Sequence, residues 1–172
     1  MKLTELCTQL DTRLQSIASA AERLETIVDV IRQGFKVSQE EVAIFLYDHL
    51  TETIHFLWPM RLRSAGSIPI TAHNSLAVKT IREKQPFLNN SFSNTPHAAI
   101  FEQVRLSPEV SPLPIQKIMS APLPSQSEII GVIQVSRKGD SGISAGEDFT
   151  PAQLTALSKI SECVSRFIDQ SS

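Results

Sequence analysis

Two apolar runs separated by a short polar stretch decide the fold of this chain. They lie in IMSAPLPSQSEIIGVIQVSRKG, residues 118–139, where runs 118–123 and 129–135 flank the letters PSQSE. Runs of about six residues rich in Ile and Val, bounded by Pro, Ser and Gly, are typical of β-strands joined by a turn. The stretch therefore predicts a β-hairpin with its turn at PSQSE and with Gly131 at a bulge or a close approach.

Four further segments predict extended structure around this hairpin. EVAIFLYD, residues 41–48, is apolar at both alternate positions, which is typical of a strand covered on both faces. TIHFLW, residues 53–58, predicts the next strand. SIPIT, residues 67–71, predicts a short strand that Pro69 restricts to a sheet edge or a bulge, and PFLNN, residues 86–90, predicts another extended run.

The N-terminal region predicts amphipathic helix, because apolar residues recur three and four positions apart over residues 3–33. Ser19 and Glu22 have the spacing of a capping box, which favours two helices, about 3–17 and 20–33, over a single one.

The apolar stripe on the first of these helices is narrow, as in coiled coils, and predicts pairing with a second copy of the chain. The predicted dimerisation residues are Leu3, Leu6, Leu10, Leu14 and Ile17. The alternative is that the stripe packs on its own domain. Residues 1–18 are thus expected to be an N-terminal dimerisation or linker helix, and residues 19–172 the domain that follows it.

Two more helices are expected in the middle of the chain. Asn74 predicts the N-cap of a helix that continues to Lys84. Residues 89–114 then contain four prolines and little periodicity, as in a functional connection. Inside it, Thr95 and Pro96 predict a helix start, and the short helix that follows is a candidate lid over a binding site.

The C-terminal segment carries a clear helix signal. Thr150 is the predicted N-cap, Pro151 the first helical residue, and Gln153 completes a capping box. The apolar face that follows predicts a terminal helix lying on a sheet or on a partner helix.

Composition limits the classes of function. The chain has 172 residues, 41% hydrophobic and 20% charged, with a formal net charge of −2, which predicts one globular domain and no basic surface for nucleic acid. No stretch resembles a leader or reaches the roughly 20 apolar residues of a membrane span, so a cytoplasmic protein without membrane contact is expected. The two cysteines have no C-x-x-C spacing and are expected to be packing residues in a reducing compartment.

In order and spacing, three stretches resemble the GAF family of small-molecule sensory domains. They are VAIFLYD, IPITAHNSLAVKTIREKQPFLNN, and MSAPLPSQSEIIGVIQVSRKG followed by FTPAQLTALSKISECVSRFID. The resemblance covers roughly residues 19–170. It implies an α+β fold with a central antiparallel sheet of five to six strands. The terminal helices would cover one face and mediate dimerisation, and the middle helix and the lid would roof a pocket on the other face.

Known specialisations of the family are poorly matched by this chain. The cyclic-nucleotide type has Asn-Lys after the last strand and an acidic pair after a Phe. Here Lys138 and Phe149 match, but Arg137 replaces the Asn, and Gln and Leu replace the acids. The bilin-carrying type needs a cysteine, and the type that reduces free methionine sulfoxide needs thiols at the pocket. No cysteine lies between Cys7 and Cys163.

Other chemistry is not indicated. The four histidines have no metal-ligand spacing, and neither a phosphate loop nor a G-x-S-x-G elbow is present. We therefore expect no enzyme activity, no cofactor and no metal.

A small-molecule site is expected where polar and aromatic residues gather in the middle of the chain. The predicted ligand-binding residues are Trp58, Arg61, His73, Asn74, Asn89, Phe92, His97 and Phe101. Arg61 and its neighbour Arg63 favour an anionic group on the ligand. The competing interpretation is structural for each residue: a helix cap for Asn74, core positions for Trp58 and Phe101, and solvated turns for the arginines.

Three functions follow as hypotheses. The first is a sensory and regulatory domain that binds an unidentified small molecule and signals through its terminal helices, as a homodimer, to an unknown downstream protein. The second is a dimerisation or interaction module whose pocket is filled by its own side chains. The third is a thiol-dependent reductase of the methionine-sulfoxide type, for which the pocket cysteines are missing.

Overall fold

The predicted β-hairpin is present. In a computed structural model of the protein, which describes residues 2–95 and 113–169, strands β5 (Ile115–Ser125) and β6 (Glu128–Lys138) pair antiparallel, with the turn inside PSQSE. Each strand has 11 residues, longer than the six or so predicted. Pro122 lies within the predicted run, and the extension adds Pro124. Because β4 pairs only with residues 118–120 of β5, neither proline has a β4 partner whose ladder hydrogen bond it would remove.

The sheet has six antiparallel strands in the order β3-β2-β1-β6-β5-β4. The other four are β1 (Val42–Asp48), β2 (Thr53–Trp58), β3 (Ser67–Pro69) and β4 (Phe87–Asn89). The two short strands form the two edges, so the prediction that Pro69 restricts its strand to an edge is confirmed.

Four α-helices accompany the sheet in the described part of the chain: α1 (Leu3–Ser16), α2 (Ala20–Phe35), α3 (Leu76–Glu83) and α4 (Pro151–Asp169). Short 3₁₀ turns span Gln39–Glu41, Met60–Leu62 and Phe92–Asn94. The break before α2 is confirmed, because the Ser19 hydroxyl accepts a hydrogen bond from the Glu22 backbone N–H at 3.3 Å.

Helix ends agree with the predictions at α4 and differ at α3. The Thr150 hydroxyl accepts from the Gln153 N–H at 3.2 Å, and the Gln153 side chain accepts from the Thr150 N–H at 2.9 Å, a complete capping box. The N-cap of α3 is Ser75, whose hydroxyl accepts from the Val78 N–H, so the prediction of Asn74 as the cap is wrong by one position.

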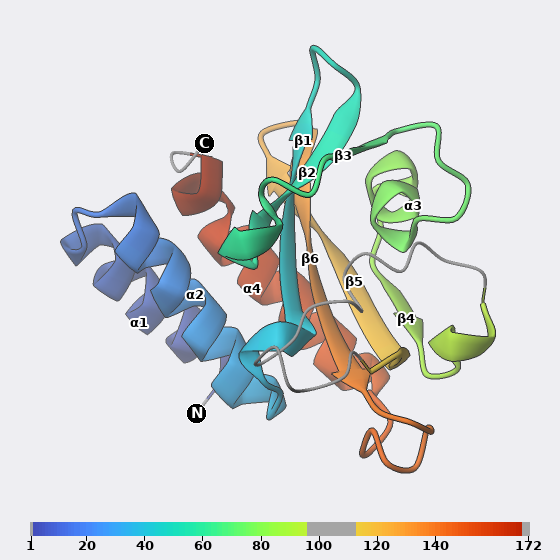
Figure 1. Ribbon diagram of the computed structural model, residues 1–172. Helices are drawn as coiled ribbons and strands as arrows, with labels where there is room; N and C mark the ends of the chain where they lie inside the picture. The colour runs from blue at the N-terminus through green and yellow to red at the C-terminus, as the bar shows by residue number, and fades with distance from the viewer. Residues whose placement is uncertain (1, 96–112, 170–172) are drawn as a thin grey trace.

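The helices divide between the two faces of the sheet (Figure 1). On one face, α1, α2 and α4 enclose a core that contains Ile44 and Ile133 of the sheet with Leu157 of α4. On the other face, Phe45 of β1 packs in a second core with Val78 of α3. Strand β1 is therefore covered on both sides, as its sequence predicts.

The apolar stripe of α1 lies against its own chain. Leu10 is 3% exposed and Leu14 is fully buried in the core beneath α1, α2 and α4, and Leu3, Leu6 and Ile17 pack partly buried against the same core. Because α4 contributes to the same core, packing of the stripe on its own domain, the alternative stated above, describes what α1 does in this structure. Pairing of two chains stays a prediction, and it cannot use Leu10 or Leu14 in this conformation.

Gly131 marks a close approach, as predicted. A Cβ atom at this position would lie 2.1 Å from the backbone carbonyl oxygen of Phe45 on the neighbouring strand. Only glycine lets β6 and β1 approach this closely without a shift of the backbone.

Candidate functional site

Four of the predicted ligand-binding residues surround one cavity. His73 and Asn74 precede α3, Asn89 ends β4, and Phe92 lies in the 3₁₀ turn that follows. The cavity has a volume of about 320 Å³ and lies between the start of α3 and the strand β4. We refer to it as the α3–β4 pocket.

The lining of this pocket favours hydrogen-bond acceptors and negative charge on a ligand. Of the described residues that line it, none is acidic. Lys79 contributes a cation, held with its ammonium 4.6 Å from the centre of the Phe87 ring. Asn89 is fixed by its own contacts: its side chain donates to the Thr95 hydroxyl at 3.2 Å and accepts from the Ser91 N–H at 2.8 Å.

Sequence reasoning missed Lys79, although a signal was available. It follows the N-cap Ser75 by four residues, so both lie on the same side of α3. A neighbouring hollow of about 330 Å³ shares His73, Ser75 and Lys79 with the pocket and adds Arg82 and Glu83. The two added charges are of opposite sign, so Lys79 is the cation that distinguishes the pocket itself.

Trp58 and Arg61 lie away from the α3–β4 pocket, and their assignment to it is a wrong prediction. The pairing of β1 and β2 shifts register near the end of β2, so that Trp58 lies opposite Ile44. Its side chain packs against the core under α1, α2 and α4, on the face of the sheet opposite α3. Its indole N–H points to the Gln39 carbonyl oxygen at 3.5 Å. Arg61 pairs with Glu40 at 3.6 Å.

Arg63 likewise serves the backbone, because its Nε donates to the Leu57 carbonyl oxygen at 2.9 Å. The predicted contacts of His97 and Phe101, and the lid helix that contains them, lie outside the described residues.

The space directly beneath α3 is filled by side chains. Ala77, Val78 and Ile81 are at most 6% exposed and pack on the sheet. Between them, the Thr80 and Ser120 hydroxyls are 2.7 Å apart, and both are fully buried. The candidate site is therefore at the rim of α3, where the helix begins, and not under the helix.

A chain of contacts links this rim to the terminal helices. Asn90, next to the pocket residue Asn89, accepts from the Phe149 N–H and donates to the Phe149 carbonyl oxygen, each at 2.9 Å. Arg137 lies over the Phe149 ring at 4.6 Å. The same guanidinium donates to the carbonyl oxygens of Phe35 and Lys36 at the end of α2.

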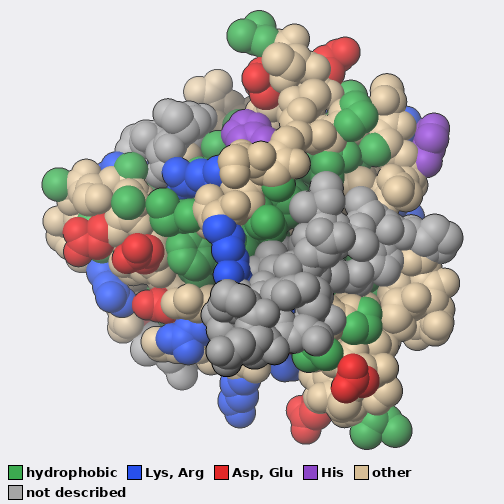
Figure 2. All heavy atoms as spheres, viewed as in Figure 1, with side chains coloured by type: hydrophobic (Ala, Val, Ile, Leu, Met, Phe, Trp, Pro, Cys, Tyr) green, Lys and Arg blue, Asp and Glu red, His purple; other side chains and the backbone are tan. Residues whose placement is uncertain are grey.

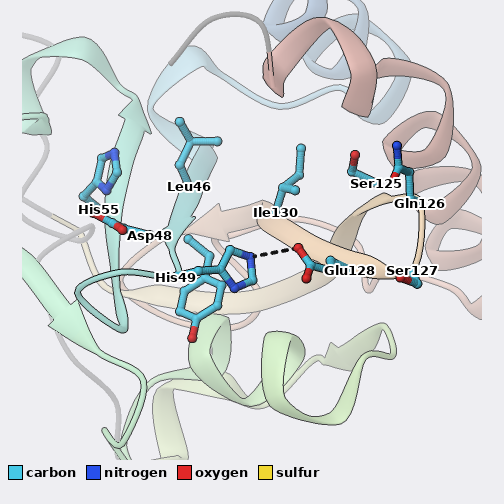
Figure 3. A pocket seen from close by; sticks show the side chains of 10 residues that line it. Leu46, Asp48, His49, His55, Ser125, Gln126, Ser127, Glu128 and Ile130 are labelled. Carbon is cyan, nitrogen blue, oxygen red and sulfur yellow. Dashed lines mark ion pairs between the residues drawn. The ribbon is translucent and has the colours of Figure 1, made fainter.

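A second, larger hollow of about 660 Å³ lies between the β1–β2 and β5–β6 turns. His49 points across it to Glu128, with Nε2 and Oε2 3.7 Å apart (Figure 3). The Asp48 carboxylate accepts hydrogen bonds from the backbone N–H groups of Leu50 and Thr51. These bonds lower the pKa of the carboxyl, with the larger effect from Leu50. These polar groups hold the turns in place, and this hollow contains none of the predicted ligand-binding residues.

The surface and the side-chain clusters add little further chemistry. Acidic and basic side chains are scattered over the face seen in Figure 2, without a large area of one sign. Within residues 2–95 and 113–169, no three His, Cys, Asp or Glu side chains are grouped so as to hold a metal ion. No helix in the same part of the chain is long and apolar enough to cross a membrane.

In the described part of the chain, the architecture is that of an α+β domain: a six-stranded antiparallel sheet with α1, α2 and α4 on one face and α3 on the other. The family model for the GAF domain matches residues 19–168, so this chain belongs to the GAF family, a family of sensory and regulatory domains. Among curated proteins, none matches the chain by sequence.

Solved structures with the same fold come from several kinds of protein. The GAF domain from an Acinetobacter phosphoenolpyruvate-protein phosphotransferase has a TM-score of 0.70 and 16% identity, over 99% of this chain and 96% of that chain. The corresponding domain from Coxiella burnetii has a TM-score of 0.72 and 9% identity, over 98% and 94%. A free methionine-R-sulfoxide reductase from Neisseria meningitidis has a TM-score of 0.67 and 15% identity, over 98% and 89%. At such identities the likeness shows the fold alone.

Proposed function

We propose that this GAF domain is a sensory module that binds a small molecule with an anionic or hydrogen-bond-accepting group in the α3–β4 pocket. The observation that carries the proposal is the lining of that pocket, where His73 and Asn74 before α3, Lys79 on α3 and Asn89 of β4 surround one cavity. None of the described residues that line it is acidic. Cavities with a few polar groups among aromatic residues are typical of small-molecule sites.

The signal is proposed to leave the pocket through Asn90 and Phe149. A ligand that moves Asn89 also moves its neighbour Asn90, whose two hydrogen bonds hold the backbone just before α4. Phe149 in turn contacts Arg137, which binds the last carbonyl groups of α2. A ligand acts by favouring one arrangement of these contacts over another, and a downstream protein would read the terminal helices.

The experiment begins with the protein as purified. Denaturation followed by mass spectrometry identifies any co-purified compound, and a metabolite library is tested by its effect on the melting temperature. We expect a ligand that raises the melting temperature of the wild type. Replacing Lys79 with Met should reduce this rise, whereas replacing Arg61 with Met should leave it unchanged, because Arg61 is paired with Glu40 outside the pocket. Equal loss in both variants, or no ligand at all, would count against the proposal.

A second function is favoured by one observation, the close packing beneath α3. Ala77, Val78 and Ile81 fill the space between α3 and the sheet, so no ligand is needed to complete the core there. A dimerisation or interaction module would fit this packing. Light scattering that shows a homodimer, together with no response to the library, would support this function in place of the first.

Reductase activity of the methionine-sulfoxide type is not part of the proposal. Such chemistry needs a thiolate at the substrate. Cys7 is on α1 and Cys163 on α4, and these helices cover the face of the sheet opposite α3. A cytoplasmic location stays an expectation drawn from the composition.

A further inference from the structure

The two cysteines, which come from opposite ends of the chain, meet between α1 and α4. The thiol of Cys7 lies 3.9 Å from the carbonyl oxygen of Lys159 and donates to it. In an α-helix that oxygen is also the acceptor for the backbone N–H four residues later, which belongs to Cys163. The side chain of Cys7 therefore sits against the turn of α4 that carries Cys163, close enough for Cys7 to contribute to the raised pKa of the Cys163 thiol.

Contacts that follow the pair along both helices hold α1 against α4. One turn further along, Arg166 of α4 forms an ion pair with Asp11 of α1. Leu10 and Leu14 anchor the same helix in the core. Cys7 is buried and Cys163 is partly exposed, so Cys163 is the more accessible residue of the two.

We propose that Cys7 and Cys163 are a redox modification site, at which a small-molecule disulfide oxidises the pair to an intramolecular disulfide that fastens α1 to α4. The Cys163 thiol loses its proton and attacks the reagent, which releases one reagent thiol and leaves a mixed disulfide. The Cys7 thiol then loses its proton and attacks the sulfur of Cys163, which releases the second reagent thiol. Two protein thiols are oxidised and one reagent disulfide is reduced to two thiols.

The environment of the pair makes this exchange slow at neutral pH. The pKa of the Cys163 thiol is raised to about 12, mainly by burial and secondly by its interaction with Cys7. Only the thiolate attacks a disulfide, so the rate of exchange rises as the pH increases. The site therefore responds to prolonged exposure to an oxidising disulfide pool and does not act as a fast peroxide sensor.

A disulfide between α1 and α4 should raise the melting temperature of the protein. The bridge joins residues near the two ends of the chain, so it restricts almost the whole unfolded chain. From typical values for long loops and for a domain of this size, the melting temperature should rise by about 10 °C.

The test uses the full chain, reduced, freed of reductant and incubated with oxidised glutathione at mildly alkaline pH. We expect the intact mass to fall by two hydrogen atoms, no glutathione to be retained, and no thiol to react with maleimide in denaturant. The melting temperature should rise as stated and return after addition of dithiothreitol.

The matched variants are Cys7→Ser and Cys163→Ser, which keep the shape of each side chain and leave a single thiol. In Cys7→Ser we expect retained glutathione on Cys163 and no rise in melting temperature. The wild type before and after dithiothreitol provides the same comparison without a substitution. Glutathione retained on both thiols, cross-linked pairs of chains, thiols that stay free in the folded protein, or an unchanged melting temperature would each overturn the proposal.

Discussion

Replacing Leu14 with Ala tests whether α1 is part of the folded domain. The Leu14 side chain is 0% exposed in the core beneath α1, α2 and α4. Removing a fully buried leucine side chain costs about 2–5 kcal/mol of the free energy of unfolding, because apolar contacts are lost and a cavity remains. For a domain of this size, a loss of about 3 kcal/mol lowers the melting temperature by roughly 6–12 °C.

Thermal unfolding followed by circular dichroism measures this change, and Gln9→Ala on the exposed side of the same helix is the matched control. The control should alter the free energy of unfolding by less than about 0.5 kcal/mol. Light scattering on the same samples separates stability from self-association. If Leu14→Ala kept the melting temperature of the wild type but lost a dimer, the stripe would pair two chains and the packing described here would be refuted.

The remaining predictions concern Gly131, Asn90 and Cys163. Gly131→Ala should destabilise the protein by about 2 kcal/mol or more in chemical denaturation, because its Cβ would meet the Phe45 carbonyl oxygen; an unchanged midpoint would contradict the close approach. Asn90→Ala should cost about 2 kcal/mol, since the N–H and carbonyl of Phe149 lose their side-chain partners, and a loss below about 0.5 kcal/mol would refute this. Alkylation of Cys163 by iodoacetamide should accelerate with pH without a plateau below about pH 10, because its pKa is raised to about 12. Since the folded state holds this proton more tightly than the unfolded state, stability should also fall as the pH rises from the ordinary thiol range toward 12.

Features set by local sequence could be predicted well. The capping box at Thr150, the helix break at Ser19 and the strand restricted to an edge by Pro69 each depend on a few neighbouring residues. The hairpin was recognisable from its apolar runs. Its length was underestimated, because pairing continues past the apolar runs through polar residues such as Lys117 and Arg137, and past Pro124, which has no β4 partner.

Features set by tertiary contacts could not be predicted from the sequence. Trp58 packs against the core under α1, α2 and α4 because the register of β1 and β2 shifts by one residue. A shift of one residue moves a side chain to the opposite face of the sheet. The stripe on α1 is explained by α4, which lies at the other end of the chain. The meeting of Cys7 with the turn that carries Cys163 has the same origin.

We have proposed that a ligand binds at the α3–β4 pocket and that its effect reaches α4 through Asn90 and Phe149. The most direct measurement is a two-dimensional ¹⁵N NMR titration of the protein with small molecules selected by thermal shift. Binding as proposed should move the backbone signals of residues 73–79 and 87–95 first, together with those of Phe149 and Thr150. Changes confined to the hollow between the β1–β2 and β5–β6 turns, or no change with any compound, would contradict the claim.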